Sequence, residues 1–384
     1  MKRALHLLAN LGISLTAFVL VLVICELVLR AFGHQDIYTA SSYPKELFDS
    51  SSVSGMRPGF VGAFRSSEVE GEIRINSVGF RDRERSYKPD SSTCRVLGIG
   101  DSFGFAHGLP PDQGYLALLE QDLQGIMPGM EVLNACVPGR GPNFYLDLLQ
   151  RIGPEVRPDV VLMGFFVGND LDGIVAQRDP HRSDPGINAN KTWLRRNIHL
   201  YSFVADRMKS IPFVRRMLKG YNISTGLIGA QAIDVLRTEE SADFKAGWER
   251  LEDVLRAMKG LAPGLVVVAI PTVEQVESDR LVQALERLEY QPSEVDVRHP
   301  MERLSRMCSQ LGIAQVDLLG PMTRRYAKDH EALYFEIDPH FNARGHAAAA
   351  DVLAAAFRSG MASNGIPMPN CPRTRSITSL PRGS

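Results

Sequence analysis

Short apolar runs separated by amphipathic segments dominate the sequence from about residue 95 onward. The run Val160–Phe166 is almost wholly apolar, which is typical of a parallel strand whose sheet is covered on both faces. Four other runs have the length and the apolar character of a buried strand. The pattern therefore predicts five strands, at residues 95–100, 131–135, 160–166, 265–270 and 313–318.

Between these strands, apolar residues recur at the spacing of one helix face. A helix is predicted over residues 112–124, with Asp112 as its N-cap, and another over residues 241–260, with Ser241 as its N-cap. An alanine-rich segment predicts a last helix over residues 345–358. Because strands alternate with helices, the pattern predicts a doubly wound α/β domain with a parallel five-stranded sheet.

The first thirty residues form a different, continuous apolar segment. Ala4–Cys25 contains no acidic or basic residue other than His6 and follows Lys2 and Arg3. As a helix this stretch is about 33 Å long, which is enough to cross a bilayer. The cationic residues place the N-terminus in the cytoplasm and the rest of the chain outside. We therefore expect a single-pass membrane protein with an extracytoplasmic domain.

Two alternatives to an uncleaved anchor are disfavoured. A cleaved signal peptide needs a shorter apolar core and a small-x-small cleavage site, whereas the nearest candidate, Ala31-Phe32-Gly33, follows the charged residues Glu26 and Arg30. A lipoprotein site at Cys25 is disfavoured by the bulky Ile24 before it. An uncleaved signal-anchor is the better interpretation.

The remaining domain boundaries follow from segments that interrupt the alternation of strands and helices. Residues 171–240 are too long for an ordinary connection, and within them residues 194–219 mix basic and apolar side chains. This basic segment could form a lid or a face that binds anionic lipid or polymer. The favoured interpretation is a solvated pair of helices packed on the core. The predicted organisation is a transmembrane signal-anchor (1–33), an extracytoplasmic lead-in (34–90), the α/β domain (91–361) with a helical insertion (171–240), and a disordered tail (362–384).

Composition narrows the classes of function. The formal net charge is −1, which gives no electrostatic reason to expect a nucleic-acid partner. The sequence lacks zinc-type Cys/His spacing and a phosphate-binding glycine-rich loop, so neither a metal nor a nucleotide cofactor is expected. Cys94 and Cys136 fall at opposite ends of neighbouring predicted strands, so we expect no structural disulfide framework.

Candidate chemistry lies where the first three predicted strands end. Gly100-Asp101-Ser102 follows the first strand, Gly139 lies after the second and Asn169 after the third. With strand order 2-1-3-4-5, Ser102 lies between Gly139 and Asn169 at the carboxyl edge of the sheet. A serine hydroxyl can attack a carbonyl there. The Ser102 N–H, the Gly139 N–H and the Asn169 amide would then stabilise the oxyanion. Taken singly, Gly139 is more often a plain turn glycine and Asn169 a loop asparagine that caps the backbone.

A candidate base follows the fifth predicted strand. Asp338-Pro339-His340 places a carboxylate and an imidazole on one loop just before the last helix. His340 would accept the Ser102 proton, and Asp338 would orient His340. His346 is the poorer candidate, because the start of a helix disfavours a protonated imidazole.

Four sequence blocks resemble those of the SGNH (GDSL-type) hydrolase superfamily: Ile99–Phe103, Asn134–Gly139, Gly168–Asp170 and Asp338–His346. The resemblance spans roughly residues 90–360. It implies a flavodoxin-like three-layer αβα fold, with Ser102 as nucleophile, Ser102, Gly139 and Asn169 as oxyanion donors, and Asp338 and His340 completing the triad. The Gly-x-Ser-x-Gly pattern also fits an α/β-hydrolase elbow, but only one strand of the domain precedes Ser102.

One departure concerns the acid and the base. Most family members place two residues between them, whereas only Pro339 separates Asp338 from His340. The shorter form resembles the family's polysaccharide O-acetyltransferase branch. The anchor and the lead-in are similar to those of bacterial members of the family that act in exopolysaccharide or envelope modification.

The sequence thus predicts a membrane-anchored serine esterase that removes acyl groups, acetyl by preference, through an acyl-enzyme on Ser102. One alternative is an O-acyltransferase that modifies an exopolysaccharide or envelope glycan. The other is a non-catalytic envelope scaffold. The expected partners are an acylated glycan or other ester substrate, the membrane and polysaccharide-assembly proteins.

Overall fold

The computed structural model describes most of the chain and divides it into two compact units. The smaller unit comprises residues 1–42, 65–67 and 180–227, and the larger one residues 43–64, 68–179 and 228–384. The described residues are 2–31, 43–65, 68–88, 93–171, 174, 198–209, 233–262, 264–336, 338–363 and 366.

The larger unit is built on a five-stranded sheet of order β4-β3-β5-β6-β7, in which every neighbouring pair is parallel. This order confirms the predicted 2-1-3-4-5 arrangement, and every residue of β3, β5 and β6 is buried, as the apolar runs require. The strands end within one residue of the predicted limits. They are β3 (Cys94–Ile99), β4 (Met130–Asn134), β5 (Val160–Phe166), β6 (Leu265–Ile270) and β7 (Ala314–Asp317).

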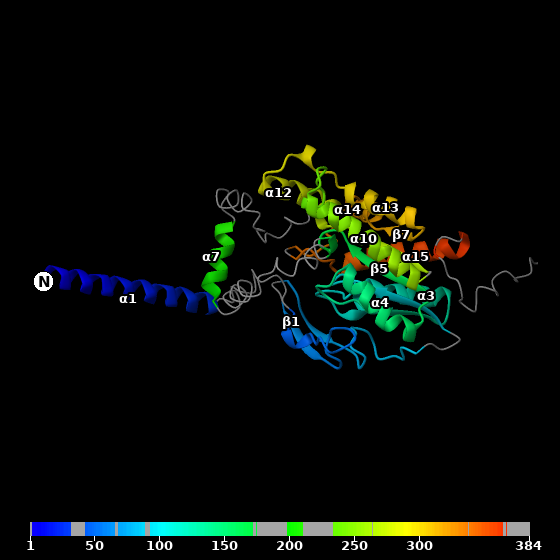
Figure 1. Ribbon diagram of the computed structural model, residues 1–384, viewed down its shortest axis with the longest axis horizontal. Coiled ribbons are helices and arrows are strands. Elements are labelled where there is room, and N and C mark those ends of the chain that lie inside the picture. The colour runs from blue at the N-terminus through cyan, green and yellow to red at the C-terminus, as the bar shows by residue number, and fades with distance from the viewer. Residues whose placement is uncertain are drawn as a thin grey trace, which may run out of the picture. The chain divides into compact units, whose positions relative to one another are not determined.

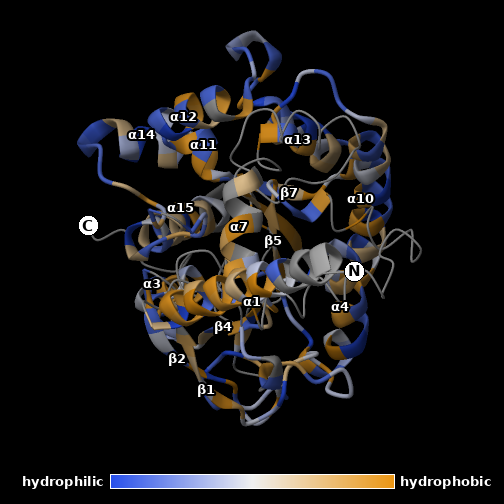
Figure 2. Cartoon of the chain, turned by 90° about the vertical axis from the view of Figure 1, so that its left-hand side faces the viewer, coloured by the Kyte–Doolittle hydropathy of each residue, from blue (hydrophilic) through white to orange (hydrophobic). Residues whose placement is uncertain are grey.

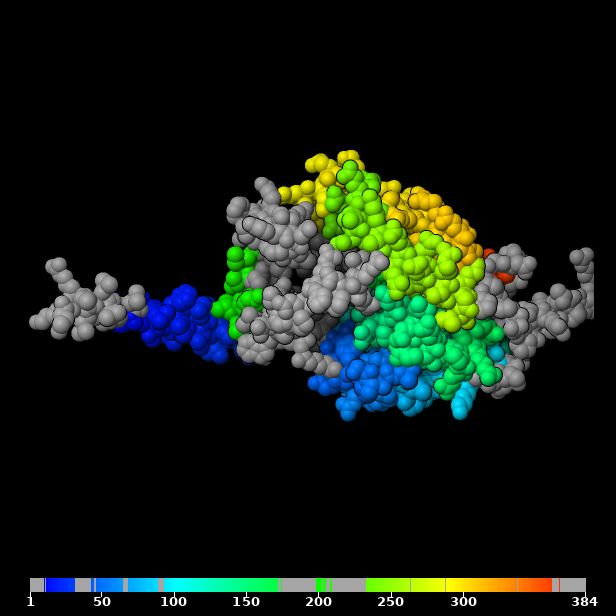
Figure 3. Space-filling model, viewed as in Figure 1, coloured from blue at the N-terminus to red at the C-terminus, as the bar shows by residue number. Residues whose placement is uncertain are grey.

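Helices cover both faces of this sheet and give the three-layer αβα architecture (Figure 1). On one face α3 (Tyr115–Ile126) packs against β4 and against α15 (Ala343–Ser363). On the other, α4 (Pro142–Val156) packs against α10 (Ala242–Leu261), which contacts α13 (His299–Leu311). The green and yellow-green atoms of α4 and α10 cover this face in Figure 3. The remaining helical segments of the unit are η1 (Lys45–Leu47), η2 (Pro111–Gln113), α11 (Val273–Val276), α12 (Ser278–Leu288), η3 (Pro292–Glu294) and α14 (Leu319–Asp329).

The ends of the helices test the predicted caps. Ser241 caps α10 as expected, since its hydroxyl accepts a hydrogen bond from the Phe244 N–H, although the helix continues one residue past Gly260. Asp112 is not an N-cap: it lies in η2, and α3 starts only after Gly114. The last helix begins at Ala343 rather than Gly345. The Asn342 side chain accepts hydrogen bonds from the backbone N–H groups of Arg344 and Gly345 and so caps an earlier start.

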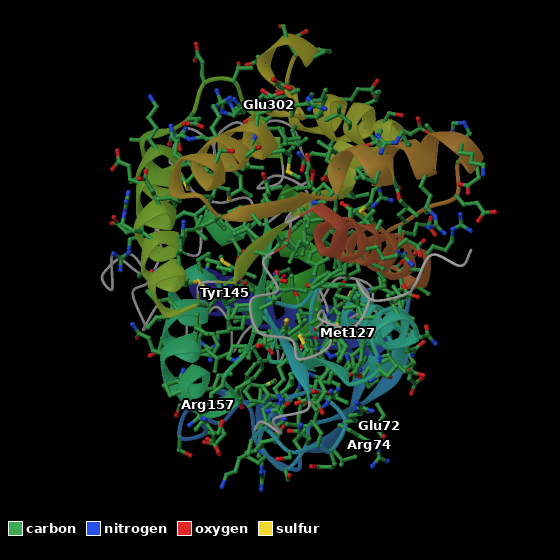
Figure 4. The ribbon with its side chains drawn as sticks, turned by 90° about the vertical axis from the view of Figure 1, so that its right-hand side faces the viewer. Glu72, Arg74, Met127, Tyr145, Arg157 and Glu302 are labelled. Carbon is green, nitrogen blue, oxygen red and sulfur yellow. The ribbon has the colours of Figure 1, made fainter. Side chains whose placement is uncertain are left out.

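The lead-in forms the two-stranded sheet of β1 (Val61–Arg65) and β2 (Glu70–Arg74). On β2 Ile73 is buried, whereas the residues on either side of it are exposed. Glu72 and Arg74 form an ion pair on the exposed side of this strand (Figure 4). Lead-in residues from Tyr43 to Phe64 and from Glu68 to Lys88 belong to the larger unit, with the α/β domain.

The smaller unit contains α1 (Lys2–Ala31) and α7 (His199–Lys209). Residues 12–31 of α1 have a mean hydropathy of 2.6 and none of that stretch is buried, so the helix is a candidate membrane span (Figure 2). A signal sequence near the N-terminus has the same properties. The Glu26 carboxylate accepts hydrogen bonds from the His199 and Leu200 N–H groups and thereby caps α7. Of the basic segment 194–219, the structure describes only residues 198–209. Most of the predicted disordered tail also lies outside the described residues.

The cysteines contradict one expectation. Cys94 is disulfide-bonded, whereas Cys25, Cys136 and Cys308 are free, so the expected absence of a structural disulfide is wrong. The expectation rested on Cys94 and Cys136, which flank neighbouring strands and do not pair. Cys136 is indeed free and buried, and the partner of Cys94 lies outside the described residues.

Candidate active site

Ser102 lies in a tight loop at the carboxyl end of β3. The loop folds back on itself through hydrogen bonds from the Phe105 N–H to the Asp101 carbonyl and from the His107 N–H to the Ser102 carbonyl, each 3.0 Å long. The Asp101 carboxylate accepts a further hydrogen bond from the Phe103 N–H at 2.9 Å. These contacts present the Ser102 side chain, which is only 7% exposed, at the edge of the sheet.

The structure brings Ser102, His340 and Asp338 together. His340 Nε2 lies 2.7 Å from Ser102 Oγ, and His340 Nδ1 is hydrogen-bonded to Asp338 Oδ1. The same Asp338 oxygen accepts the His340 backbone N–H at 3.0 Å. A single intervening residue, Pro339, therefore suffices, because Asp338 binds both the backbone and the ring of His340. This is the arrangement of a nucleophile, a base and an orienting acid.

Asp338 is held in its ionised form. Burial opposes its ionisation, but hydrogen bonds from His107 and His340 outweigh burial and hold the pKa of Asp338 well below its usual value. A carboxylate in this state accepts the Nδ1–H of His340 and leaves Nε2 free to take a proton from Ser102.

The predicted oxyanion donors lie in the loops that follow β3, β4 and β5. Within the described part of the chain, the Ser102 and Gly139 N–H groups donate no hydrogen bond to another group of the protein. Gly139 has a φ of +71°, and a Cβ at this position would meet no atom within 4 Å, so the space beside it is open to a ligand. Asn169 is exposed, and its side-chain amide binds no other described residue. Among the described residues, none therefore occupies these three donors.

Sequence reasoning missed a second imidazole at this site. His107 Nε2 lies 3.3 Å from Asp338 Oδ2, and His107 Nδ1 is hydrogen-bonded to the hydroxyl of Tyr43. The His107 and His340 rings stack with centroids 4.1 Å apart and an angle of 27° between their planes. The sequence signal for His107 was its position, five residues after Ser102 in the same loop. No sequence pattern points to Tyr43.

His346 lies elsewhere, as expected. It is 1% exposed, and its Nδ1 accepts a hydrogen bond from the Tyr115 N–H at 3.2 Å. Burial, followed by electrostatic contributions from His340, Arg81 and His107, lowers the pKa of His346 to about 3. A buried, neutral imidazole bonded to the backbone has a structural role.

Two buried carboxyl groups, those of Asp101 and Asp170, belong to the segments that follow β3 and β5. Burial raises the pKa of Asp101 to about 6. Burial and then the charge of Asp101 raise the pKa of Asp170 well above its usual value, although Asp170 accepts hydrogen bonds from the Phe166 N–H and the Tyr145 hydroxyl. These hydrogen bonds fix the loops that carry Ser102 and Asn169.

A metal ion is a further possibility for this cluster, because the ligand atoms of His107, Asp338 and His340 lie within 4.8 Å of one another. In the structure these atoms already face one another as hydrogen-bond donors and acceptors. A metal ion would have to displace the proton on His340 Nδ1 that orients the ring toward Ser102. The donor set is therefore better satisfied by hydrogen bonding than by a metal ion.

Comparison with protein families adds an independent finding. Residues 231–384, which include Asp338 and His340, match the family described as SGNH hydrolase-like domain, acetyltransferase AlgX. This C-terminal part of the chain is therefore similar to an SGNH hydrolase-like domain. The match agrees with the resemblance of the fourth sequence block, Asp338–His346, while the other three blocks lie before residue 231. Curated protein sequences give no match.

Solved structures with a similar arrangement have low sequence identity. A lipolytic G-D-S-L family protein from Veillonella parvula has 12% identity and a TM-score of 0.38, over 69% of this chain and 99% of that one. The acetyl xylan esterase AlAXEase has 15% identity and a TM-score of 0.39, over 68% and 98%. A catalytic variant of Axe2, an acetylxylan esterase from Geobacillus stearothermophilus, has 16% identity and a TM-score of 0.38, over 69% and 94%.

Proposed function

We propose that the protein is a membrane-anchored, extracytoplasmic esterase that removes acetyl or other small acyl groups from a glycan. The observation that carries the proposal is the contact of His340 Nε2 with Ser102 Oγ at 2.7 Å, with Asp338 on the opposite ring nitrogen. A binding module has no need of a serine aligned in this way with a base. The proposed substrate is an acylated glycan, and polysaccharide-assembly proteins are proposed partners.

The proposed reaction proceeds through an acyl-enzyme. Ser102 Oγ attacks the acyl carbonyl while His340 Nε2 takes the hydroxyl proton, and Asp338 stabilises the imidazolium that forms. The Ser102 and Gly139 N–H groups and the Asn169 amide bind the oxyanion. Collapse of the tetrahedral intermediate breaks the bond to the sugar oxygen, which leaves with the proton from His340. Water, activated by His340, then releases the acid and restores Ser102.

A second candidate, an O-acetyltransferase, uses the same residues. It is favoured by the match of residues 231–384 to the family named for an acetyltransferase. The two reactions differ only in the second step, in which a sugar hydroxyl replaces water as the acceptor of the acyl group. The proton balance is the same, because His340 removes the proton from either nucleophile.

Two observations support the extracytoplasmic location. The helix α1 begins with Lys2 and Arg3, and none of its apolar stretch is buried by the protein. The disulfide at Cys94 is typical of an oxidising compartment and rare in the cytosol.

Labelling with a serine-directed fluorophosphonate tests the proposal on the full-length protein in detergent micelles. We expect covalent capture at Ser102 in the wild type and none in Ser102→Ala, with circular dichroism confirming that both are folded. Folded wild-type protein that resists labelling would overturn the proposal and favour a scaffold. Partition of an acetyl donor between free acetate and an added glycan then distinguishes the esterase from the transferase.

A further inference from the structure

The acid of the site is shared by two imidazoles. Asp338 Oδ1 accepts the Nδ1–H of His340, and Asp338 Oδ2 lies 3.3 Å from His107 Nε2. His107 is 2% exposed and stacks on His340, so it contacts both other members of the acid–base pair. Nothing in the reaction described above uses His107.

The protonation of His107 follows from its partners. An ionised carboxylate only accepts hydrogen bonds, so the nitrogen that faces Asp338 must carry the proton, and this nitrogen is Nε2. Nδ1 is then an acceptor and takes the hydrogen bond of the Tyr43 hydroxyl. Burial raises the pKa of Tyr43 well above its usual value, so this hydroxyl keeps its proton. Tyr43 thereby selects the tautomer that donates to Asp338.

His107 also remains uncharged at neutral pH. Burial, together with the nearby charge of His340, lowers the pKa of His107 to about 4, even though Asp338 acts in the opposite direction. A second positive charge stacked 4.1 Å from His340 would oppose transfer of the Ser102 proton to His340. A neutral His107 fixes Asp338 without this penalty.

The two loops that meet at Asp338 are anchored by the lead-in. Arg81 donates hydrogen bonds of 2.7–2.8 Å to the carbonyls of Phe105, Ala106 and Leu109, on both sides of His107. The Glu68 carboxylate accepts the Asp338 N–H at 2.7 Å. These contacts fix the backbone of both loops, and His107 adds a contact to the second carboxylate oxygen of Asp338, Oδ2.

We propose that His107, aligned by Tyr43, is a positioning residue that locks the Asp338 carboxylate against His340 Nδ1. The inference rests on the proposed function, since it assigns a role in the same serine-dependent reaction. It also accounts for the short Asp-Pro-His spacing: the carboxylate is fixed from its second oxygen by a residue of the serine loop.

Three variants test this role through kcat on a p-nitrophenyl ester. His107→Leu removes the donor, and we expect kcat to fall about 10–10²-fold with KM within twofold, because misplacement of a catalytic group by about 1 Å costs up to about 10²-fold. His107→Gln retains an N–H donor near the position of Nε2 and should recover most of the loss. Tyr43→Phe keeps the ring and removes the hydroxyl that selects the tautomer, so kcat should fall several-fold. His299→Gln and Tyr290→Phe, which remove a histidine and a tyrosine hydroxyl far from this cluster, are the matched controls.

Imidazole NMR separates positioning from a general loss of structure. In the wild type we expect His107 to carry its proton on Nε2 and His340 to show a downfield Nδ1 proton, which should weaken in His107→Leu and return in His107→Gln. Wild-type kcat in folded His107→Leu would overturn the inference, as would a loss of kcat without any change in the His340 Nδ1 proton. If His107→Leu does not fold, Tyr43→Phe and His107→Gln decide by the same readouts. Failure of the wild type itself to react at Ser102 would instead refute the proposed function.

Discussion

Replacing His346 should alter the pH dependence of stability and leave catalysis largely intact. This imidazole is buried between Tyr115 and Phe341, accepts the Tyr115 N–H through Nδ1, and has no partner for Nε2 among the described residues. His346→Leu removes an acceptor from the Tyr115 N–H, which costs about 1–3 kcal/mol, but it also removes a buried N–H without a partner. These two effects oppose each other at neutral pH, so the informative quantity is how the free energy of unfolding changes with pH.

The magnitude follows from the pKa of His346, which falls from 6.5 in a model peptide to about 3 in the folded protein. Below pH 6.5 the unfolded chain binds a proton at this position and the folded chain does not. The stability contributed by the neutral histidine is therefore complete above pH 6.5 and is lost as the pH falls toward 3. The loss is about 1.4 kcal/mol per pH unit, or about 3 kcal/mol between pH 6.5 and 4.5.

Urea unfolding of the full-length protein in detergent, followed by the fluorescence of buried Trp248, measures this difference. The free energy of unfolding of His346→Leu, relative to that of wild type, should rise by about 3 kcal/mol between pH 7 and pH 4.5. Asp101→Asn provides a control of opposite sign. The pKa of Asp101 is raised to about 6, so its contribution to stability is present below pH 4 and is lost as the pH rises through 6.

A stability difference between wild type and His346→Leu that stays constant from pH 7 to pH 4.5 would refute the assignment of His346 as a buried neutral group. Turnover adds a second criterion. Folded His346→Leu should keep kcat within about tenfold of wild type, whereas His340→Ala should lose several orders of magnitude, because members of a triad act as a unit. Loss of turnover in the first variant and retention in the second would reverse the roles of the two histidines.

Two further predictions concern the oxyanion donors and the membrane topology. Asn169→Ala should still be labelled by a fluorophosphonate but lose about 10²–10³ in kcat, the usual cost of one oxyanion donor, and parental turnover would exclude Asn169 from that role. A reporter that is active only in the periplasm should be active when fused after Ser384, because Lys2 and Arg3 keep the N-terminus inside; activity of a cytoplasm-only reporter at that position would reverse the topology.

The sheet was predictable because each strand is an apolar run with its own limits. Val160–Phe166 and Leu265–Ile270 have the predicted bounds, and the parallel order follows from the alternation of strands and helices. Helix starts were less predictable where several residues compete as caps. Ser241 directly precedes α10 and caps it, whereas Asp112 follows two prolines and falls within η2.

The site was predictable to the extent that its chemistry lies in short motifs. Ser102 and the pair Asp338 and His340 occupy loops that strand order brings to one edge, and the structure places them in hydrogen-bond contact. His107 and the disulfide at Cys94 depend instead on which distant segments meet. A single histidine or cysteine carries no sequence signal for its partner, since side chains pair according to the tertiary fold.

The lead-in shows why contacts between distant segments matter for function. Tyr43 reaches the His107 ring, Glu68 binds the backbone of Asp338, and Arg81 holds the loop that carries His107. Together these contacts hold both loops, the one that carries His107 and the one that carries Asp338. A base needs its acid in one orientation throughout the reaction. The Asp338 carboxylate contacts His340 through one oxygen and His107 through the other, and both loops are anchored, which lowers the reorganisation that each turnover requires. Under the proposed function, the segment before the α/β domain would therefore help to position the acid of the reaction.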